Sequence, residues 1–466
     1  MYVQTSTFLQ KKLNIALSGV KSSIYEPTCT FVNGNTEYKK TWKTIEKLMI
    51  MQDFTGSFSD VIQGVLKVQP AELRELLQNM QDLQCFILLK PIRAYSFTYA
   101  ANSEPLIITG RVLLDFKDDM DKMFTAQSFG QRNVRNENNP LQTPDQAAFH
   151  SVLNFHLVEG DVYTMRNTQM NCIIRDATPE KIIHWASERM GAEEVSAIPP
   201  DNTQNYSNFV IPPMKSVQDV FPYMQERCGV YSKGMGYYYT GKKMYVYPQS
   251  DQSQSTSPTQ WVVHLINAPA GSLDDVHSYH NVVSDDKEIY IASSTQANAM
   301  TKTTEATENN GNAHVSLQAD RMQDNLFTKN SDGTVSRNES TVTSLSQQNT
   351  AGNMTQTTQR VVYDGESSNP YTTTSAMAAA DATNLITGWI HAVPRLLEPG
   401  QTIFYHFDGQ NGEYKIQKGR LEKVAYESTL HAASLGKQAW MSFIATLHIR
   451  LDPEYLSEAE TQTTQS

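Results

Sequence analysis

Three observations on this chain predict a mainly β protein with α+β parts. Short runs rich in β-branched and aromatic residues recur at both ends of the sequence, separated by Pro-Gly, Asn-Gly or polar turns. Only a few short segments space their apolar residues as a helix does. Between the two ends lies a long region dominated by Thr, Ser, Asn and Gln, without any apolar period. Together they predict two β-rich modules around a small mixed module, plus a polar insertion.

The C-terminal module, expected over residues 361–455, has the clearest strand pattern. Its apolar runs are found at residues 388–394, 397–407, 414–416 and 440–452. A run at 361–363 resumes strand character, and the Ala-rich segment 375–385 is expected to form a helix that leads into the first long run. The module contains no nucleophile, metal cluster or phosphate loop, so it is predicted to be architectural.

The N-terminal module is expected over residues 1–166. Its predicted strands lie at residues 13–17, 30–32, 61–68, 85–89, 107–108, 112–116, 151–157 and 162–166. One helix interrupts them, beginning at Pro70, a residue that suits the first helical turn. Its apolar residues are three and four apart and form one stripe, which we expect to face the core: Leu73, Leu76, Leu77 and Met80.

A compact mixed module is expected over residues 167–255. Thr178 is a good N-cap and Pro179 suits the first turn, so a helix is predicted to begin there. A second helix is expected near 216–224, kinked or shortened by Pro222. The tyrosine-rich run 236–248 turns at Thr240 and Gly241 and is predicted to form a hairpin.

The rest of the chain divides into connecting strands, an insertion and a tail. Residues 256–292 contain two predicted strands, at 261–267 and 288–292. Residues 293–360 are too polar to offset their ordering entropy alone, so they are expected to form a mobile insertion or a segment ordered by neighbouring subunits. Residues 456–466 form a polar tail.

Composition limits the classes of function. The chain has 466 residues, enough for about three domains. Its formal net charge is −11, which argues against sequence-independent binding of nucleic acid. The four cysteines lie far apart and are expected to be buried thiols in a protein assembled in a reducing compartment: Cys29, Cys85, Cys172 and Cys228. The sequence shows neither a signal peptide nor an apolar stretch of the ~18 residues that span a bilayer, so no membrane association is expected.

No pattern of catalytic or ligand-binding residues stands out. The acidic run at 118–121 lacks the spacing and the glycine of a calcium loop. His277 and His280 lie beside several aspartates, but three residues apart in a polar loop fixes no metal geometry. We therefore predict no catalytic residue, no cofactor, no metal and no enzymatic activity.

The order of these segments resembles the baseplate hub proteins of contractile-tailed bacteriophages, which join the tail tube to the central spike. Four places carry the resemblance. Residues 54–68, with the following helix and the strand 83–91, look like the start of the first tube-like domain. Residues 211–248 look like the middle domain, and the polar insertion follows in the expected place. Residues 397–403, 414–416 and 440–451 look like the closing strands of the second tube-like domain.

The resemblance implies two tube-like antiparallel β-barrel domains in each subunit of a homotrimer. Three copies of two barrels would match a six-fold tube to a three-fold spike. The implied partners are the tail tube protein, the central spike protein and baseplate wedge proteins. Phage DNA or the tape measure protein would only pass through the lumen. The implied location is the virion, in the tail baseplate, after assembly in the host cytoplasm.

Strands at the edges of such barrels need a neighbour to cover their backbone groups. The candidate residues for a subunit or tube interface are Val152, Phe155, Leu157, Val162, Tyr163, Met165, Ile444, Leu447, Ile449 and Leu451. Ordinary strands within one subunit are the alternative for each of them. Two other functions stay open, namely another β-rich tail component (a tube terminator or a wedge protein) and a cell-wall hydrolase with its carboxylates hidden among the many acids.

Overall fold

The computed structural model describes the protein in a series of segments. These are Lys11 and residues 24–43, 45–92, 105–114, 151–251, 262–268, 282–283, 288–302, 316–319, 326–329, 335–338, 383–390, 392–408, 413–431 and 440–456. Most of them are strands, with few helices, which confirms the predicted mainly β class with α+β parts. The predicted strands at 13–17 and 361–363, the predicted helix before residue 383, and both runs of acids and histidines lie outside the described residues.

The N-terminal strands close into a first circuit. In order of pairing it runs β22-β3-β5-β8-β7-β6-β1-β23, and β23 pairs with β22 again. Every neighbouring pair in this circuit is antiparallel. Its strands from the first part of the chain are β1 (Ile24–Asn33), β3 (Lys47–Asp53), β5 (Val61–Val68), β6 (Gln84–Ile92), β7 (Leu106–Leu114) and β8 (Ser151–Val158), and β2 (Tyr38–Trp42) adds to the edge of β1. β1 and β5 alternate buried residues with half-buried or exposed ones, as expected of a barrel wall with a filled interior.

The later strands close into a second circuit, in the order β14-β21-β22-β23-β20-β16 and back to β14. Its strands are β14 (Val262–Ala268), β16 (Glu288–Lys302), β20 (Thr383–Ile390), β21 (Thr402–Asp408), β22 (Tyr414–His431) and β23 (Trp440–Leu456), and β15 (Val282–Val283) pairs with β16. Both partners of β14 are parallel to it, whereas the other pairs in this circuit are antiparallel.

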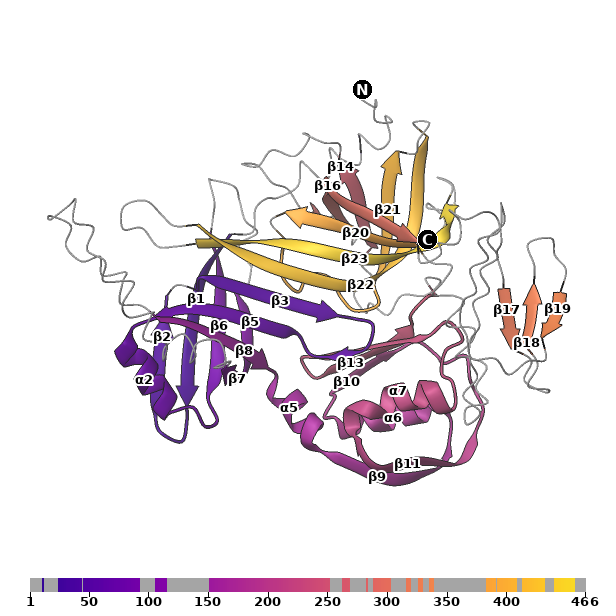
Figure 1. Ribbon diagram of the computed structural model, residues 1–466, viewed down its shortest axis with the longest axis horizontal. Coiled ribbons are helices and arrows are strands. Elements are labelled where there is room, and N and C mark those ends of the chain that lie inside the picture. The colour runs from indigo at the N-terminus through magenta and orange to yellow at the C-terminus, as the bar shows by residue number, and fades with distance from the viewer. Residues whose placement is uncertain are drawn as a thin grey trace, which may run out of the picture.

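The two circuits share the pair β22–β23. Residues 414–420 of β22 pair with β21 of the second circuit, and residues 423–427 pair with β3 of the first. Between them the register shifts at Glu422, whose backbone carbonyl accepts a hydrogen bond from the Phe54 amide at 2.7 Å. A bulge of this kind bends the strand, here where it passes from one neighbour to the other. Figure 1 shows β22 and β23 lying between the two groups of strands.

The mixed module lies against both circuits (Figure 1). Its elements are α5 (Gly160–Asn167), β9 (Gln169–Ala177), α6 (Pro179–Arg189), β10 (Glu194–Ala197), β11 (Tyr206–Ser216), η3 (Val217–Asp219), α7 (Val220–Arg227), β12 (Met235–Thr240) and β13 (Lys243–Pro248). The tyrosine hairpin β12–β13 and the Thr178 cap, whose hydroxyl accepts from the Lys181 amide at 3.4 Å, are as predicted. The short strand β4 (Ser57–Phe58), which follows β3, pairs in parallel with β12 and so joins this sheet to the first circuit.

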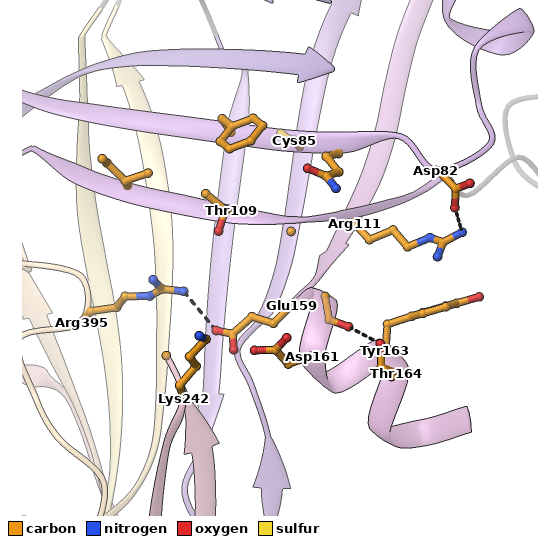
Figure 2. A pocket seen from close by; sticks show the side chains of 16 residues that line it. Asp82, Cys85, Thr109, Arg111, Glu159, Asp161, Tyr163, Thr164, Lys242 and Arg395 are labelled. Carbon is orange, nitrogen blue, oxygen red and sulfur yellow. Dashed lines mark hydrogen bonds and ion pairs between the residues drawn. The ribbon is translucent and has the colours of Figure 1, made fainter. Parts of the chain in front are cut away.

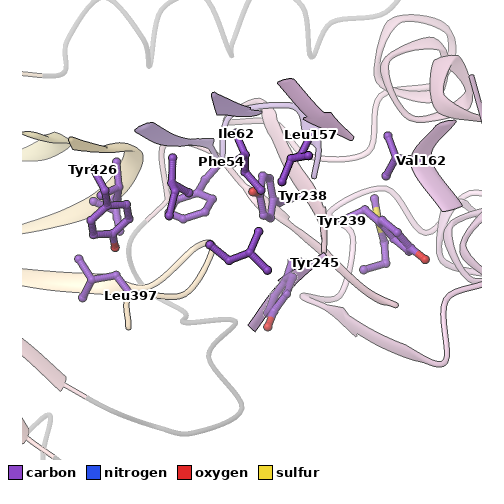
Figure 3. Packing of buried hydrophobic residues seen from close by; sticks show 14 of the residues in the cluster. Phe54, Ile62, Leu157, Val162, Tyr238, Tyr239, Tyr245, Leu397 and Tyr426 are labelled. Atoms are coloured by element: carbon purple, nitrogen blue, oxygen red, sulfur yellow. The ribbon is translucent and has the colours of Figure 1, made fainter. Parts of the chain in front are cut away.

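One apolar core runs through the three modules. Figure 3 shows Tyr426 of β22, Leu397 of the loop after β20, Phe54 after β3 and Tyr238 of β12 in one packed series. The modules therefore bury apolar area against one another and not only within themselves. Among the described residues no helix is long and apolar enough to cross a membrane.

Several predicted details are wrong. The segment Val162 to Met165 was expected to be a strand but lies in α5, where both residues face inward from one side of a short helix. The predicted end of the helix 375–385 is wrong, because residues Thr383 to Leu385 form the start of strand β20. Pro222 lies in the first turn of α7, where no amide is required, and the α-helix begins only at Val220, later than the predicted start near 216.

The stripe on α2 (Pro70–Gln78) is narrower than predicted. Leu73 and Leu76 are buried, but Leu77 and Met80 are exposed. The polar insertion also carries more structure than expected. β16 continues to Lys302, and three short strands form a separate antiparallel sheet: β17 (Ser316–Ala319), β18 (Leu326–Lys329) and β19 (Val335–Asn338).

Candidate assembly interface

The ten residues predicted to form an interface fall into two groups. Val152 and Ile444 are 48% and 46% exposed, and Tyr163 is half-buried. The side chains of the other seven are buried within the chain's own core: Phe155, Leu157, Val162, Met165, Leu447, Ile449 and Leu451. For the residues of β8 and β23 this division follows the two-residue period, which turns alternate side chains to opposite faces. Val162, Tyr163 and Met165 lie on α5 instead, where Val162 and Met165 are buried on one side. Contact of these residues with another subunit stays a prediction.

The exposed residues belong to a face that continues across both circuits. Ile444 of β23 pairs with Ile390 of β20 and with Glu427 of β22. From Glu427 the row passes through Met49 of β3 to Gln63 of β5. Gln63 pairs in turn with His156 of β8, and His156 pairs with Leu113 of β7, where the row ends. Ile444, Glu427 and Leu113 are exposed, and the other side chains in this row are partly exposed. The row therefore lies on one outer surface of the shared sheet.

Charged side chains on this face occur in pairs. Lys423 donates to Asp53 at 2.6 Å, Lys67 to Glu46 at 2.8 Å, and Lys47 forms an ion pair with Glu427. Exposed pairs of this kind add little stability, at most about 1 kcal/mol each. They do leave this face close to electrically neutral.

A buried carboxylate joins the three modules. The Asp60 side chain is fully buried after β4, and its Oδ2 lies 2.7 Å from the Nε of Arg395 in the loop between β20 and β21. Gln52 of β3 donates to Oδ1 at 3.0 Å, and the hydroxyl of Tyr238 of β12 also donates to Oδ1. Each module therefore contributes a partner to Asp60, an arrangement that no local sequence pattern indicates.

The pKa values around this carboxylate follow from burial and charge. Burial raises the pKa of Tyr238 well above its usual value, and the charge of Asp60 raises it further. Glu159, just before α5, also has a raised pKa, first because of burial and then because of Asp60. Burial disfavours the charge of Arg395, but the adjacent Asp60 outweighs this and raises its pKa.

A cavity of about 510 Å³ opens beside this junction, between the outer faces of β6 and β7, α5 and the β12–β13 turn. Figure 2 shows Arg395 pointing to Glu159 on one side and Arg111 to Asp82 on the other. The charged groups are 4.0 Å and 2.7 Å apart, respectively. The volume lies within the range of about 300–1,000 Å³ that is typical of ligand pockets.

The described part of the chain offers no metal centre. No group of three His, Cys, Asp or Glu side chains in it could hold a metal ion. All four cysteines are free thiols; the closest approach is between Cys29 and Cys85 inside the first circuit, whose sulfur atoms lie 3.5 Å apart. Burial raises the pKa of Cys228 to about 11, which suppresses the thiolate.

No protein-family model matches the chain, and no curated protein matches it by sequence. Among solved structures it is similar to a tail protein from Neisseria meningitidis MC58, with 10% identity, a TM-score of 0.45, and coverage of 92% of this chain and 97% of that one. The 43 kDa tail protein of prophage MuSo2 from Shewanella oneidensis has 7% identity and a TM-score of 0.44, with 93% and 100% covered. A chain of the half-lidded Francisella PdpA–VgrG complex has 9% identity and a TM-score of 0.38, with 97% and 62% covered. Because these TM-scores are low, we base the function on the contacts within this chain.

Proposed function

We propose that the protein is a structural component of a phage-type contractile tail, a baseplate hub that joins a six-fold tail tube to a three-fold central spike. The observation that carries the proposal is the pair of closed strand circuits built on the shared strands β22 and β23. Three copies of a chain with two barrels would present six barrels to a six-fold ring, and three equivalent surfaces to a three-fold partner.

The shared strands suit such an adaptor physically. Two barrels joined by a flexible linker would have to lose their relative freedom on assembly, which costs binding free energy. Here β22 and β23 are hydrogen-bonded into both circuits, so the spacing of the barrels is set before any partner arrives. The Asp60 junction fixes the mixed module in the same unit.

The near-neutral face across β20, β23, β22, β3, β5 and β8 suits a surface past which DNA or a tape measure protein moves. Its ion pairs leave few free cations to hold phosphate groups. A formal net charge of −11 works in the same direction. The proposed role needs no catalysis, and we propose that the protein is not an enzyme and carries no cofactor.

The proposed partners are further copies of the chain, the tube protein, the spike protein and baseplate wedge proteins, within a virion assembled in the host cytoplasm. One similar solved structure belongs to a complex of PdpA with VgrG, and two others are tail proteins. We take these as compatible with the proposal, which rests on the two circuits.

Oligomeric state and symmetry test the proposal. Light scattering of the purified chain is expected to give three times the monomer mass of 52.4 kDa. Electron-microscopy class averages are expected to show a three-fold particle whose rim has six similar lobes. A stable monomer over the micromolar range would contradict the hub, and a six-subunit ring would favour a tube terminator. Peptidoglycan clearing that is lost on substitution of a carboxylate would instead indicate a hydrolase.

A further inference from the structure

We propose that the copies contact one another head to tail, the β9–β11 ribbon of one copy docking into the α5 cavity of the next. This inference rests on the proposed trimer and names the surfaces that hold it together. The ribbon surface is defined by Ile173, Arg175 and Val210. The cavity surface is defined by Phe86, Ile107, Glu159 and Asp161.

The ribbon exposes apolar residues that its own module does not cover. Ile173 and Val210 are 59% and 50% exposed, and they are direct cross-strand partners, so they form one apolar patch. Their neighbours Ile174 and Phe209 face the opposite way and pack into the core of the mixed module. No other strand pairs with β9 or β11 among the described residues, so the ribbon also has open edges that a neighbour could cover.

A positive charge extends the ribbon surface. Arg175 lies two residues beyond Ile173 on β9, on the same face, and is exposed opposite Asn208. Arg175 has no ion-pair partner in the part of the chain that the structure describes. The ribbon therefore presents an apolar patch with a cation at one end.

The cavity has the complementary pattern. Ile107 of β7 and Phe86 of β6 are 55% and 39% exposed and form its apolar wall. The cations along its rim have close carboxylate partners already, Arg111 with Asp82 at 2.7 Å and Lys242 with Glu193 at 2.6 Å. Arg395 is likewise held by Asp60 at 2.7 Å.

Two carboxylates of the cavity, those of Glu159 and Asp161, are less well compensated than its cations. Among the cations of the described residues, Glu159 is within ion-pair distance of Arg395 alone, at 4.0 Å. It also accepts hydrogen bonds from the Thr240 hydroxyl at 3.2 Å and from the Gly241 amide. The pKa of Glu159 is raised, first by burial and then by the nearby charge of Asp60. Asp161, in the first turn of α5, is exposed and forms no ion pair among the described residues. A basic side chain beside an apolar patch would complement both the carboxylates and the apolar wall of this cavity.

A second copy of the chain is the occupant that these surfaces indicate. The ribbon and the cavity differ from each other, so the contact is heterologous and can close into a ring by rotation. Aromatic residues and arginine are enriched in the cores of interfaces, and the cavity supplies Phe86, Tyr163 and Arg111, the last stacked 4.3 Å from the Tyr163 ring centre.

Charge reversal tests this contact. Arg175→Glu and Asp161→Arg are each expected to weaken assembly at least about tenfold, as removal of a central contact does. The double variant restores opposite charges and is expected to recover most of the association. Sedimentation at a series of concentrations measures the effect, and circular dichroism checks that each variant is folded.

An apolar substitution and a matched control complete the test. Ile173→Asp is expected to abolish the trimer, whereas Leu77→Asp, on the exposed side of α2, is expected to leave it intact. A trimeric wild type with unaffected Ile173→Asp and charge-reversal variants would overturn the docking and leave the hub proposal standing. A monomeric wild type would overturn both. Loss of the trimer in the single variants with no recovery in the double variant would overturn the pairing of ribbon with cavity.

Discussion

The Nε of Arg395 lies 2.7 Å from the Oδ2 of Asp60, and this pair joins parts of the chain that are 335 residues apart. Asp60 is fully buried and Arg395 is mostly so. Arg395 also has a φ of 62°, a left-handed conformation that costs a non-glycine residue free energy. The guanidinium of Arg395, in the loop after β20, meets a carboxylate that directly precedes β5 of the first circuit. The pair therefore connects the two circuits a second time, apart from the shared strands.

Removing Arg395 is expected to destabilise the whole unit. Arg395→Met leaves the Asp60 carboxylate buried without its cation, which typically costs about 3–5 kcal/mol. We expect the lower end of this range, because Gln52 and Tyr238 still donate to Asp60. Urea unfolding measures the loss. Lys423→Met breaks the exposed pair with Asp53 and serves as control, with an expected cost of at most about 1 kcal/mol.

The double variant Asp60→Asn, Arg395→Met distinguishes the electrostatic contribution of Arg395 to stability from the contribution of its side-chain packing. Since it removes both charges of the buried pair, it is expected to recover most of the stability that Arg395→Met loses. A double variant as unstable as the single one would show that the guanidinium acts through packing and not through Asp60.

Gly64 and Phe155 are cross-strand partners in β5 and β8, and the ring lies directly over the glycine. A Cβ at position 64 would lie 2.1 Å from the tip of that ring. Gly64→Ala is therefore expected to cost about 1–3 kcal/mol through overpacking. Adding Phe155→Leu shortens the side chain, so the double variant should be more stable than the sum of the two single effects predicts. Strict additivity in the double-mutant cycle would contradict this contact.

The raised pKa of Glu159 predicts a dependence of stability on pH. The folded protein holds this proton to a higher pH than the unfolded chain does, for which the ordinary value is 4.5. The free energy of unfolding that Glu159 contributes therefore falls as the pH rises from about 4.5 through the raised pKa. Glu159→Gln should flatten the pH profile in that window, and Glu188→Gln, an exposed carboxylate on α6, should not. Thermal unfolding from pH 4 to 8 measures both profiles.

The sequence predicts most elements but not how they combine. Alternation in β5 and the Thr178 cap of α6 are local signals, and both are confirmed. β22 is missed over most of its length, because the bulge at Glu422 breaks the two-residue period between Leu421 and Val424. α5 is missed because Val162, Tyr163 and Thr164 favour strands, whereas Val162 and Met165 are buried on one side of a helix.

The candidate interface shows the same division. The sequence alone could have placed Val152 on the outer face of β8 and Phe155 on the inner face, because side chains of a strand alternate between the two faces with a period of two residues. The Asp60 junction could not be foreseen, because Gln52, Tyr238 and Arg395 come from distant segments and carry no motif. The closing of two circuits on one strand pair is likewise a matter of long-range pairing.

The shared strands predict that the two circuits unfold together. A proline at Thr446 of β23 removes an amide from a strand that pairs there with both β20 and β22, so it should destabilise both circuits at once. Calorimetry of the wild type is expected to show one main transition for both circuits, shifted as a whole by Thr446→Pro. Lys39→Pro, in the edge strand β2 that pairs only with β1, is the control and should have a smaller effect. Two separate transitions, with only one moved by Thr446→Pro, would mean that the circuits fold independently despite the strands they share.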